Sequence, residues 1–392
     1  MQAVGISLSS CLSALGDDPR HALADILCNH KHYFSVQDGL LPRPINVGAY
    51  QGNLLDETLD TQLAELDSRN LRFALTALAH IKAPLAQMSA GIPKHRLAVV
   101  LGTSTSGISD NQYALADKLK QGTAPTLDYP KQAMHALAQA VQCYLGWDGI
   151  AYTISTACSS SGKALAVGQR LLNSDLADVV LVGGVDTLCP LTLNGFDSLE
   201  SLSATACMPC GADRDGITIG EASALFVLSP DTAPVMLQGV GESMDAWHIS
   251  APHPKGLGAY QAMARALASA NLSIGDIDYL NMHGTATPQN DAMETLAISE
   301  LFGDGVPVSS TKHKTGHCLG AAAAMESYIC QQILLQDNPH PWLPYHYHGT
   351  LDPMLPPLNY VNEHTQSPSV RHVMSNSFAF GGSNISLIFS KS

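Results

Sequence analysis

A cysteine set among small residues is the clearest candidate nucleophile in this sequence. Cys158 stands in Thr153-Ile-Ser-Thr-Ala-Cys-Ser-Ser-Ser-Gly162, where an extended segment turns sharply and a helix is expected to begin at or just after the cysteine. A thiol at a helix N-terminus faces unpaired N–H groups and the positive end of the helix dipole, which lower its pKa. We therefore expect an activated nucleophile. The alternative is a buried structural cysteine, the usual environment of a free thiol.

Two histidines follow in positions that suit chemistry. His283 ends the predicted strand Tyr279–His283, and Thr285 and Thr287 just after it offer hydroxyls to a polar substrate arm. Strand ends that lead into loops are common places for reactive groups. His317 precedes a run of small residues at a predicted helix N-terminus, where the dipole would keep its imidazole neutral. A solvated loop position is the alternative for His283, because the chain holds 16 histidines.

Other features of these stretches concern support and backbone geometry. Asn290 and Asp291 are expected to cap a helix that carries Glu294. A fourth stretch, Phe378-Ala-Phe-Gly-Gly382, ends in a glycine pair that permits unusual backbone angles and lets a ligand approach main-chain N–H groups.

Metal binding is not favoured by the spacing of these residues. His313 and His317 are four apart, as zinc ligands on a helix would be, but Thr315-Gly316 makes a continuous helix doubtful and no carboxylate of the zincin pattern lies between them. Cys207 and Cys210 form a single CxxC, which without a second pair is more often incidental than redox-active or metal-binding.

Composition excludes several classes of function. Charged residues make up 14% of the 392 residues, against about 25% in typical domains. A net charge of −14 disfavours a non-specific electrostatic grip on nucleic acid or anionic lipid. No apolar run is long enough to span a membrane. Nine scattered cysteines fit a reducing compartment rather than a disulfide framework.

The first residues resemble a bacterial lipoprotein cleavage site at Leu8-Ser-Ser-Cys11. The first basic residue is Arg20, however, so the positive region of a signal peptide is missing. We therefore expect a cytoplasmic protein.

Alternating apolar runs and amphipathic stretches predict an α/β fold. A break near residue 230 divides the chain into an N-terminal half, 1–230, with the cysteine and a C-terminal half, 231–392, with both histidines. The histidine cluster His340, His346 and His348 is expected at the surface. The predicted strands are Leu97–Gly102, Val179–Gly183, Ala224–Leu228, Val235–Gly241, Tyr279–His283, Val306–Ser309, Arg371–Ser375 and Ile385–Phe389. The predicted helices are Leu71–Leu85, Lys131–Tyr144, Ser160–Asn173, Gly258–Ala270, Ala292–Phe302 and Ala321–Leu335.

Taken together and in this order, these stretches resemble the elongating β-ketoacyl-acyl carrier protein synthases of the thiolase-like superfamily. Gly211-Ala-Asp-Arg-Asp-Gly-Ile-Thr-Ile-Gly-Glu221 also looks like that family's D-x-x-R-D-G-x-x-x-G-E stretch, and the likeness runs from about residue 97 to residue 389. It implies a thiolase-like fold, with two similar halves in a five-layered α-β-α-β-α arrangement. It also implies a decarboxylating Claisen condensation that lengthens an acyl chain by two carbons.

The resemblance assigns roles residue by residue. Cys158 looks like the acyl-accepting nucleophile, and His283 and His317 look like the pair that promotes decarboxylation and stabilises the enolate. Lys312 matches the lysine that organises the site electrostatically. The remaining implied roles are oxyanion-hole formation and gating by Phe380, binding of the phosphopantetheine arm by Thr285 and Thr287, pocket lining by Ile108 and Phe378, and support by Asp291, Glu294 and Glu326.

Some positions depart from the family pattern. Cys210-Gly211 replaces an aromatic–acidic pair, Ser223 stands where glycine is common, and Ala286 replaces glycine or serine between the threonines. These departures suggest a specialised ketosynthase like those of aryl-polyene pathways, some of which work beside a chain-length factor that lacks the cysteine.

The resemblance also implies partners. We expect an acyl carrier protein, docked on a local basic patch, to supply the phosphopantetheine, with no cofactor or metal on this chain. We also expect a homodimer or a heterodimer with a related ketosynthase or chain-length factor.

Three alternatives fit less well. A thiolase would carry a second cysteine in a C-x-G near the C-terminus, where this chain has Phe380-Gly-Gly. A starter-type ketosynthase would carry asparagine in place of His317. A non-catalytic partner subunit typically lacks the cysteine that is Cys158 here.

Overall fold

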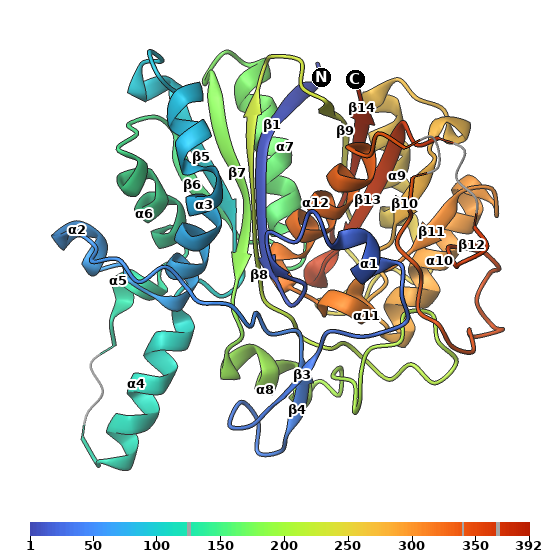
Figure 1. The fold of residues 1–392 in the computed structure, drawn as a ribbon. Helices are drawn as coiled ribbons and strands as arrows, with labels where there is room; N and C mark the ends of the chain where they lie inside the picture. Colours follow the sequence, from blue (N-terminus) through green and yellow to red (C-terminus); the bar gives the residue numbers. More distant parts are fainter. Residues whose placement is uncertain (124–126, 339–340, 366–368) are drawn as a thin grey trace.

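A large mixed sheet forms the centre of the molecule (Figure 1). The computed structural model describes residues 1–123, 127–338, 341–365 and 369–392. The strand order is β12-β11-β10-β13-β14-β9-β1-β8-β7-β5-β6, with β2 beside β1, and β3 and β4 form a separate hairpin. The strands are β1 (Val4–Ser13), β2 (Gly16–Asp17), β3 (Ser35–Gln37), β4 (Ile45–Val47), β5 (Leu97–Gly102), β6 (Ala151–Ile154), β7 (Val179–Asp186), β8 (Ala222–Ser229), β9 (Val235–Met244), β10 (Tyr279–Asn281), β11 (Pro307–Ser309), β12 (Asn359–Tyr360), β13 (His372–Phe378) and β14 (Ser383–Lys391).

The two ends of this sheet repeat one topology. The N-terminal strands lie in the order β6-β5-β7-β8-β1 and the C-terminal strands in the order β11-β10-β13-β14-β9. In each set the first two pairings are parallel and the last two antiparallel. The sets join where β1 pairs with β9. Residue 230, the predicted boundary between halves, falls between β8 and β9 and stays a prediction as a domain boundary.

Helices complete a five-layered arrangement. Two helices, α7 and α12, lie side by side between the two parts of the sheet, and each contacts strands of both parts. Helices α3 and α6 cover the outer face of the N-terminal strands, and α9 and α10 lie outside the C-terminal strands. The helices are α1 (Leu23–Leu27), α2 (Thr61–Ala64), α3 (Arg69–Met88), α4 (Ile108–Lys120), α5 (Tyr129–Gln132), α6 (Ala136–Leu145), α7 (Ser160–Asn173), α8 (Pro190–Ser198), α9 (Leu257–Ala270), α10 (Pro288–Phe302), α11 (Lys312–Thr315) and α12 (Ala322–Leu334).

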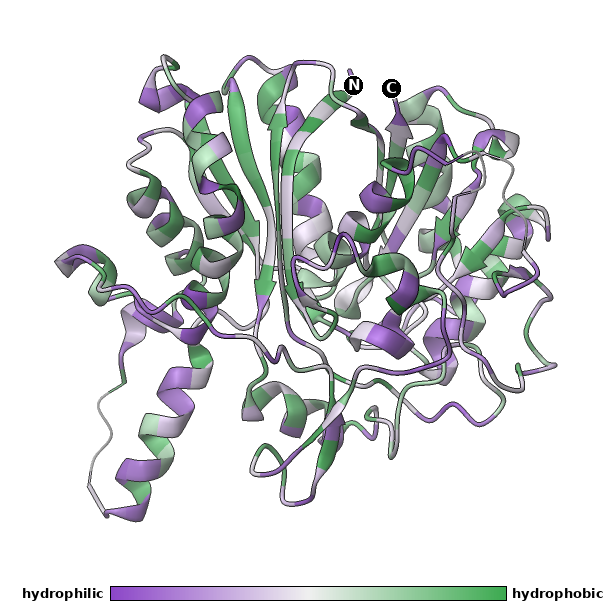
Figure 2. Cartoon of the chain, viewed as in Figure 1, coloured by the Kyte–Doolittle hydropathy of each residue, from purple (hydrophilic) through white to green (hydrophobic). Residues whose placement is uncertain are grey.

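Three large clusters of buried apolar residues lie between the layers of helices and strands. The middle cluster joins α7 and α12 to both parts of the sheet, the second lies under α3 and α6, and the third under α9 and α10. Figure 2 shows the central strands largely in the colours of apolar residues. Small residues allow the middle helices to approach closely. A Cβ on Gly162 of α7 would lie 3.2 Å from Ala323 Cβ of α12.

The structure corrects several predicted elements. Leu8–Cys11, which resembles a cleavage site, lies within β1, a strand that the sequence analysis did not predict. The sequence of β1 does not alternate between polar and apolar residues, because Ser10 and Ser13 are buried together with their apolar neighbours. The predicted helix Lys131–Tyr144 is broken between α5 and α6, where Ala133 is extended.

Two further corrections concern a loop and a cap. His346 is buried rather than at the surface, because its ring bonds the backbone on both sides, while His340 lies outside the described residues. Helix α10 begins at Pro288 after Thr287, so Asn290 and Asp291 lie inside the helix and do not cap it. Among the helices of the described residues, none is both long enough and apolar enough to cross a bilayer.

Candidate active site

Cys158 lies in the sharp turn between β6 and α7, as predicted. Ala157 adopts a left-handed conformation (φ 52°), and α7 begins at Ser160. The cysteine is buried, and its Sγ lies 3.0 Å from His317 Nε2. Burial raises the thiol pKa to about 11, against the lowering effects of the Phe380 N–H, Lys312 and the cysteine's own N–H. The expectation of a lowered pKa is therefore wrong for the free enzyme, because desolvation outweighs the helix terminus.

His283 follows β10 and is held through its backbone. Glu294 of α10 accepts hydrogen bonds from the N–H groups of His283 and Gly284, both at 2.7 Å. The rings of His283 and His317 are 5.3 Å apart and nearly perpendicular. Burial first, and then the nearby positive charge of Lys312, lowers the pKa of both histidines well below the usual value. Both imidazoles are therefore neutral near pH 7.

A buried ion pair lies behind the two histidines. The Lys312 ammonium group contacts the Glu326 carboxylate, and both side chains are almost fully buried. Burial raises the Glu326 pKa to about 7, while the lysine opposes that shift. Lys312 begins the short helix α11, which ends at Thr315, and Gly316 just after it has a positive φ of 73°. His317 therefore lies outside any helix it could share with His313, whose Nδ1 faces Ser310 O instead.

The loop after His283 is braced from α10. Asp291 accepts hydrogen bonds from Cys210 N at 2.7 Å and Ala286 N at 3.2 Å. The hydroxyls of Thr285 and Thr287 lie 3.1 Å apart on the cavity wall. Cys210, one of the departures from the family pattern, thus joins the loop before it to the threonine loop.

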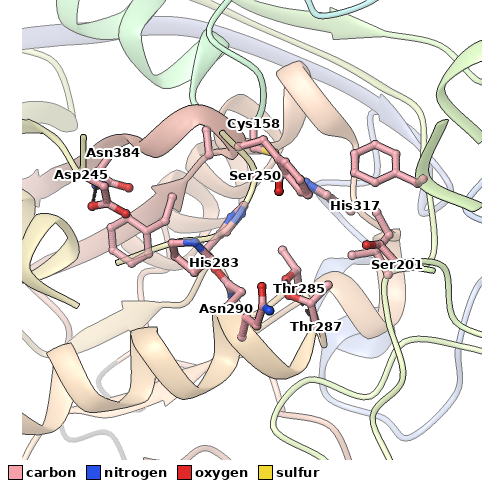
Figure 3. A pocket seen from close by; sticks show the side chains of 17 residues that line it. Cys158, Ser201, Asp245, Ser250, His283, Thr285, Thr287, Asn290, His317 and Asn384 are labelled. Carbon is pink, nitrogen blue, oxygen red and sulfur yellow. Dashed lines mark hydrogen bonds between the residues drawn. The ribbon is translucent and has the colours of Figure 1, made fainter. Parts of the chain in front are cut away.

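The thiol, the two imidazoles and the two threonine hydroxyls line one cavity of about 610 Å³ that opens to solvent (Figure 3). Figure 3 shows Cys158, His283 and His317 gathered around it, with Thr285, Thr287 and Asn290 further along the wall. The lining residues are Cys158, Phe196, Ser201, Ile217, Asp245, Ser250, Pro252, His283, Thr285, Thr287, Gln289, Asn290, His317, Phe378, Ala379, Phe380 and Asn384.

Sequence reasoning identified part of this lining and missed the rest. Phe378 and Phe380 line the cavity as expected. Ile108 begins α4 and is not among the lining residues, so its role in an acyl pocket stays a prediction. Phe196, which meets the Phe380 ring edge-on at 5.5 Å, was missed because nothing in its local sequence differs from an ordinary amphipathic helix.

A buried aspartate that ties the two halves together was also missed. Asp186, at the end of β7, accepts hydrogen bonds from Thr103 Oγ1 at 2.7 Å, from both N–H and hydroxyl groups of Ser104 and Thr105, and from Gly320 N at 2.6 Å. It thereby fixes the turn that leads from His317 into α12. The sequence signal that could have identified it is a charged residue at the end of the otherwise uncharged run Val179–Asp186.

The site has donors that a metal could use. One ligand atom each from Cys158, His283 and His317 lie within 4.8 Å of one another.

Comparison with known proteins decides the family. The profile described as "Beta-ketoacyl synthase, N-terminal domain" matches residues 56–233, and "Beta-ketoacyl synthase, C-terminal domain" matches residues 235–346. The chain belongs to the β-ketoacyl synthase family. This β-ketoacyl synthase is an acyltransferase that performs a Claisen condensation.

Named relatives agree with this assignment. "Nodulation protein E" of Rhizobium meliloti is 33% identical over 88% of this chain and 87% of that protein. "3-oxoacyl-[acyl-carrier-protein] synthase 2" of Rhizobium meliloti (strain 1021) is 35% identical over 72% of this chain and 70% of that protein. The ketosynthase (ApeO) solved in complex with its chain length factor (ApeC) from Xenorhabdus doucetiae is 41% identical, with a TM-score of 0.92 over 100% of this chain and 98% of that chain. The predicted thiolase-like α/β fold is confirmed.

Proposed function

We propose that this β-ketoacyl synthase loads an acyl group on Cys158 and condenses it with malonyl-acyl carrier protein in a polyene-type pathway. The observation that carries the proposal is the convergence of the Cys158 thiol, 3.0 Å from His317, with the neutral imidazole of His283 at one end of an open cavity. One base would be enough for simple acyl transfer. Two neutral imidazoles beside one thiol suit the generation of an enolate.

In the first step, Cys158 Sγ attacks the thioester carbonyl of the acyl carrier. The thiol pKa of about 11 means that the proton leaves during the attack, and His317 Nε2 is placed to take it. Negative charge moves to the carbonyl oxygen, which the N–H groups of Cys158 and Phe380 are placed to stabilise because both lie near the Cys158 sulfur. His317 then returns the proton to the departing pantetheine sulfur, which leaves an acyl-cysteine and a free carrier thiol.

In the second step, malonyl thioester loses CO₂. The electron pair of the broken C–C bond becomes an enolate, whose oxygen accepts hydrogen bonds from Nε2–H of His283 and His317. Because the cavity is open to solvent, the imidazole of His317 can exchange protons with water between the steps and take the tautomer with its proton on Nε2. The lowered pKa values keep both imidazoles neutral. A neutral imidazole N–H is a much weaker acid than an imidazolium, so it donates a hydrogen bond to the enolate oxygen without protonating the carbanion.

In the third step, the enolate carbon attacks the acyl-cysteine carbonyl. The two backbone N–H groups again hold the oxyanion, and its collapse expels the Cys158 thiolate, which regains a proton from solvent through His317. The product is a β-ketoacyl thioester two carbons longer.

The carrier and partner are part of the same proposal. The hydroxyls of Thr285 and Thr287, with Ser201 and Ser250 on the wall, suit the amide-rich phosphopantetheine arm, which arrives as part of the substrate. The 41% identical ketosynthase was solved with its chain length factor, and this supports a heterodimer as the working unit here. We also propose a cytoplasmic location, in line with acyl-carrier-protein-dependent relatives.

Replacement of His283 by alanine separates the two half-reactions. We expect His283→Ala to acylate Cys158 with unchanged stoichiometry, because His317 still faces the thiol, while CO₂ release from malonyl carrier falls by about 10²–10³-fold. Intact mass and CO₂ release, measured on the enzyme with its partner subunit, report the two steps. Equal loss of both would contradict the division of roles. His95→Ala, at an exposed position in the turn before β5 and outside the cavity lining, is the matched control.

A further inference from the structure

A second cluster of metal-ligating side chains lies on the surface, apart from the active-site cavity. His30, His348 and Glu363 each offer one ligand atom, and these atoms lie within 4.8 Å of one another. His30 Nε2 is 3.9 Å from Glu363 Oε2, and the rings of His30 and His348 are 4.0 Å apart. All three side chains are exposed, so a hydrated cation can reach them from solvent.

The donor set has the chemistry of a transition-metal site. Imidazole nitrogen and carboxylate oxygen bind Zn²⁺ at about 2.0–2.2 Å, which places tetrahedral ligands about 3.3 Å apart. Ligand atoms within 4.8 Å of one another need to approach by at most about 1.5 Å, which rotation of exposed side chains can supply. Two imidazoles and one carboxylate leave the fourth position of a tetrahedral site for water.

The three backbone segments that carry these side chains are fixed relative to one another. Tyr345 N donates to Leu27 O at 3.0 Å, which ties the loop of His348 to the end of α1. His346 N donates to Val361 O at 2.8 Å, which ties the same loop to the segment of Glu363. The metal would therefore bind a frame that is already assembled, and only side chains would move.

The turn that carries His30 is also anchored to the catalytic region. The buried Lys314 ammonium donates to Asn29 O at 2.6 Å and Asn29 Oδ1 at 2.9 Å, and it also contacts Lys31 O. Lys314 belongs to α11, the helix that begins with Lys312, and α1 lies near α11 in Figure 1. A cation on His30 would thus steady the turn that holds α11.

We propose that His30, His348 and Glu363 form a structural site for a divalent transition-metal cation with the ligand preference of Zn²⁺. The site joins the segment after α1 to two C-terminal loops and takes no part in the condensation.

The test uses the Cys158→Ala chain, because Cys158, His283 and His317 also offer three ligand atoms. After dialysis against a chelator, equilibrium dialysis with Zn²⁺ should show one bound equivalent. His30→Ala or Glu363→Gln, each introduced separately into the Cys158→Ala chain, should weaken the affinity for Zn²⁺. The loss should exceed the roughly 10–100-fold that follows removal of a residue that only hydrogen-bonds to a metal ligand. His32→Ala, two residues along the same exposed segment, should bind as its parent does.

Two further readouts make the result specific. Co²⁺ bound to this site should show ligand-field absorption without the charge-transfer band of a thiolate ligand. Zn²⁺ should raise the melting temperature of the Cys158→Ala chain and not that of the chain that also carries His30→Ala. Absence of a bound equivalent in the Cys158→Ala chain, or unchanged affinity after His30→Ala and Glu363→Gln, would overturn the proposal.

Discussion

At the scale of single residues, the site combines a protonated thiol and two neutral imidazoles with one buried ion pair. Burial, and after it the positive charge of Lys312, lowers the pKa of His283 and His317. The Glu326 carboxylate pairs with that charge in the interior. A buried pair of this kind adds little net stability, but loss of one partner leaves the other charge uncompensated.

This gives a prediction for stability. Lys312→Met should lower the free energy of unfolding by about 3–5 kcal/mol, because it strands the Glu326 carboxylate. The double variant Lys312→Met/Glu326→Leu should recover most of the loss. Urea unfolding measures both values.

The matched control is an exposed ion pair, Arg43 with Asp197, whose side chains are 46% and 39% exposed. Arg43→Met should cost at most about 1 kcal/mol. A double variant at Lys312 and Glu326 that is less stable than the single Lys312 variant would contradict this account, because removal of the second partner should relieve the uncompensated charge.

The sequence alone predicted which residues meet in the site, but not their protonation. Cys158, His283 and His317 come together from positions far apart in the chain, as their family pattern implied. Local sequence pointed to a helix terminus beside the cysteine, whereas burial, which decides the thiol pKa, depends on layers folded over it. Asp186 was missed for the same reason, since its partners come from two distant loops.

At the scale of elements, the two middle helices occupy equivalent places in the repeated topology. Each half contributes five strands to the repeat, and the third of them in chain order is β6 in one half and β11 in the other. Helix α7 follows β6, and α12 follows β11. Cys158 therefore precedes α7 as His317 precedes α12. The repeat brings the two reactive groups together because both helices lie in the shared middle layer.

Close contact between β5 and the first turn of α7 is predicted to be essential. A Cβ on Gly102 would lie 2.4 Å from the backbone nitrogen of Ser161. Gly102→Ala should lower the free energy of unfolding by about 1–3 kcal/mol. It should also slow acylation of Cys158, because the start of α7 must shift. Urea unfolding and the rate of acyl loading measure the two effects.

Gly195 in α8 is the matched control, because a Cβ there meets nothing within 4 Å. Gly195→Ala should raise stability by about 0.5–1 kcal/mol through the loss of backbone entropy in the unfolded chain. Wild-type stability and loading rate in Gly102→Ala would contradict the close packing.

Elements with strong periodic or apolar patterns were predicted well, and those that depend on tertiary contacts were not. Ser160–Asn173 matches α7 at both ends, and the buried run 97–102 matches β5. Strand β1 was missed because its serines resemble a loop, although pairing with β8 and β9 buries it. Helix α4 was missed because much of its surface is exposed, which leaves a weak apolar pattern.

At the scale of the whole molecule, the exposed apolar residues indicate a partner chain. Helix α4 extends away from the body in Figure 1, and its Tyr113 is 51% exposed. Strand β6 lies at the edge of the sheet.

We predict that the chain forms a dimer, with itself or with a related chain, and light scattering at micromolar concentration measures its mass. Tyr113→Asp should shift the mass toward the monomer, while Ile274→Asp, at an equally exposed position, should not. A monomeric wild-type chain, with and without a chain-length-factor partner, would contradict this prediction.

The repeated halves were expected from the family resemblance, not from composition or periodicity, because internal repeats of topology need share no sequence. The pathway and partner follow only from likeness to relatives.

The central claim is that Cys158 carries the acyl group, and intact mass after incubation with an acyl carrier thioester tests it most directly. We expect one acyl adduct per chain in the wild type and none in Cys158→Ala. The adduct should be retained in Cys143→Ala, whose half-buried thiol lies on α6. An adduct that persists in Cys158→Ala, or no adduct on the wild type even with its partner subunit, would contradict it.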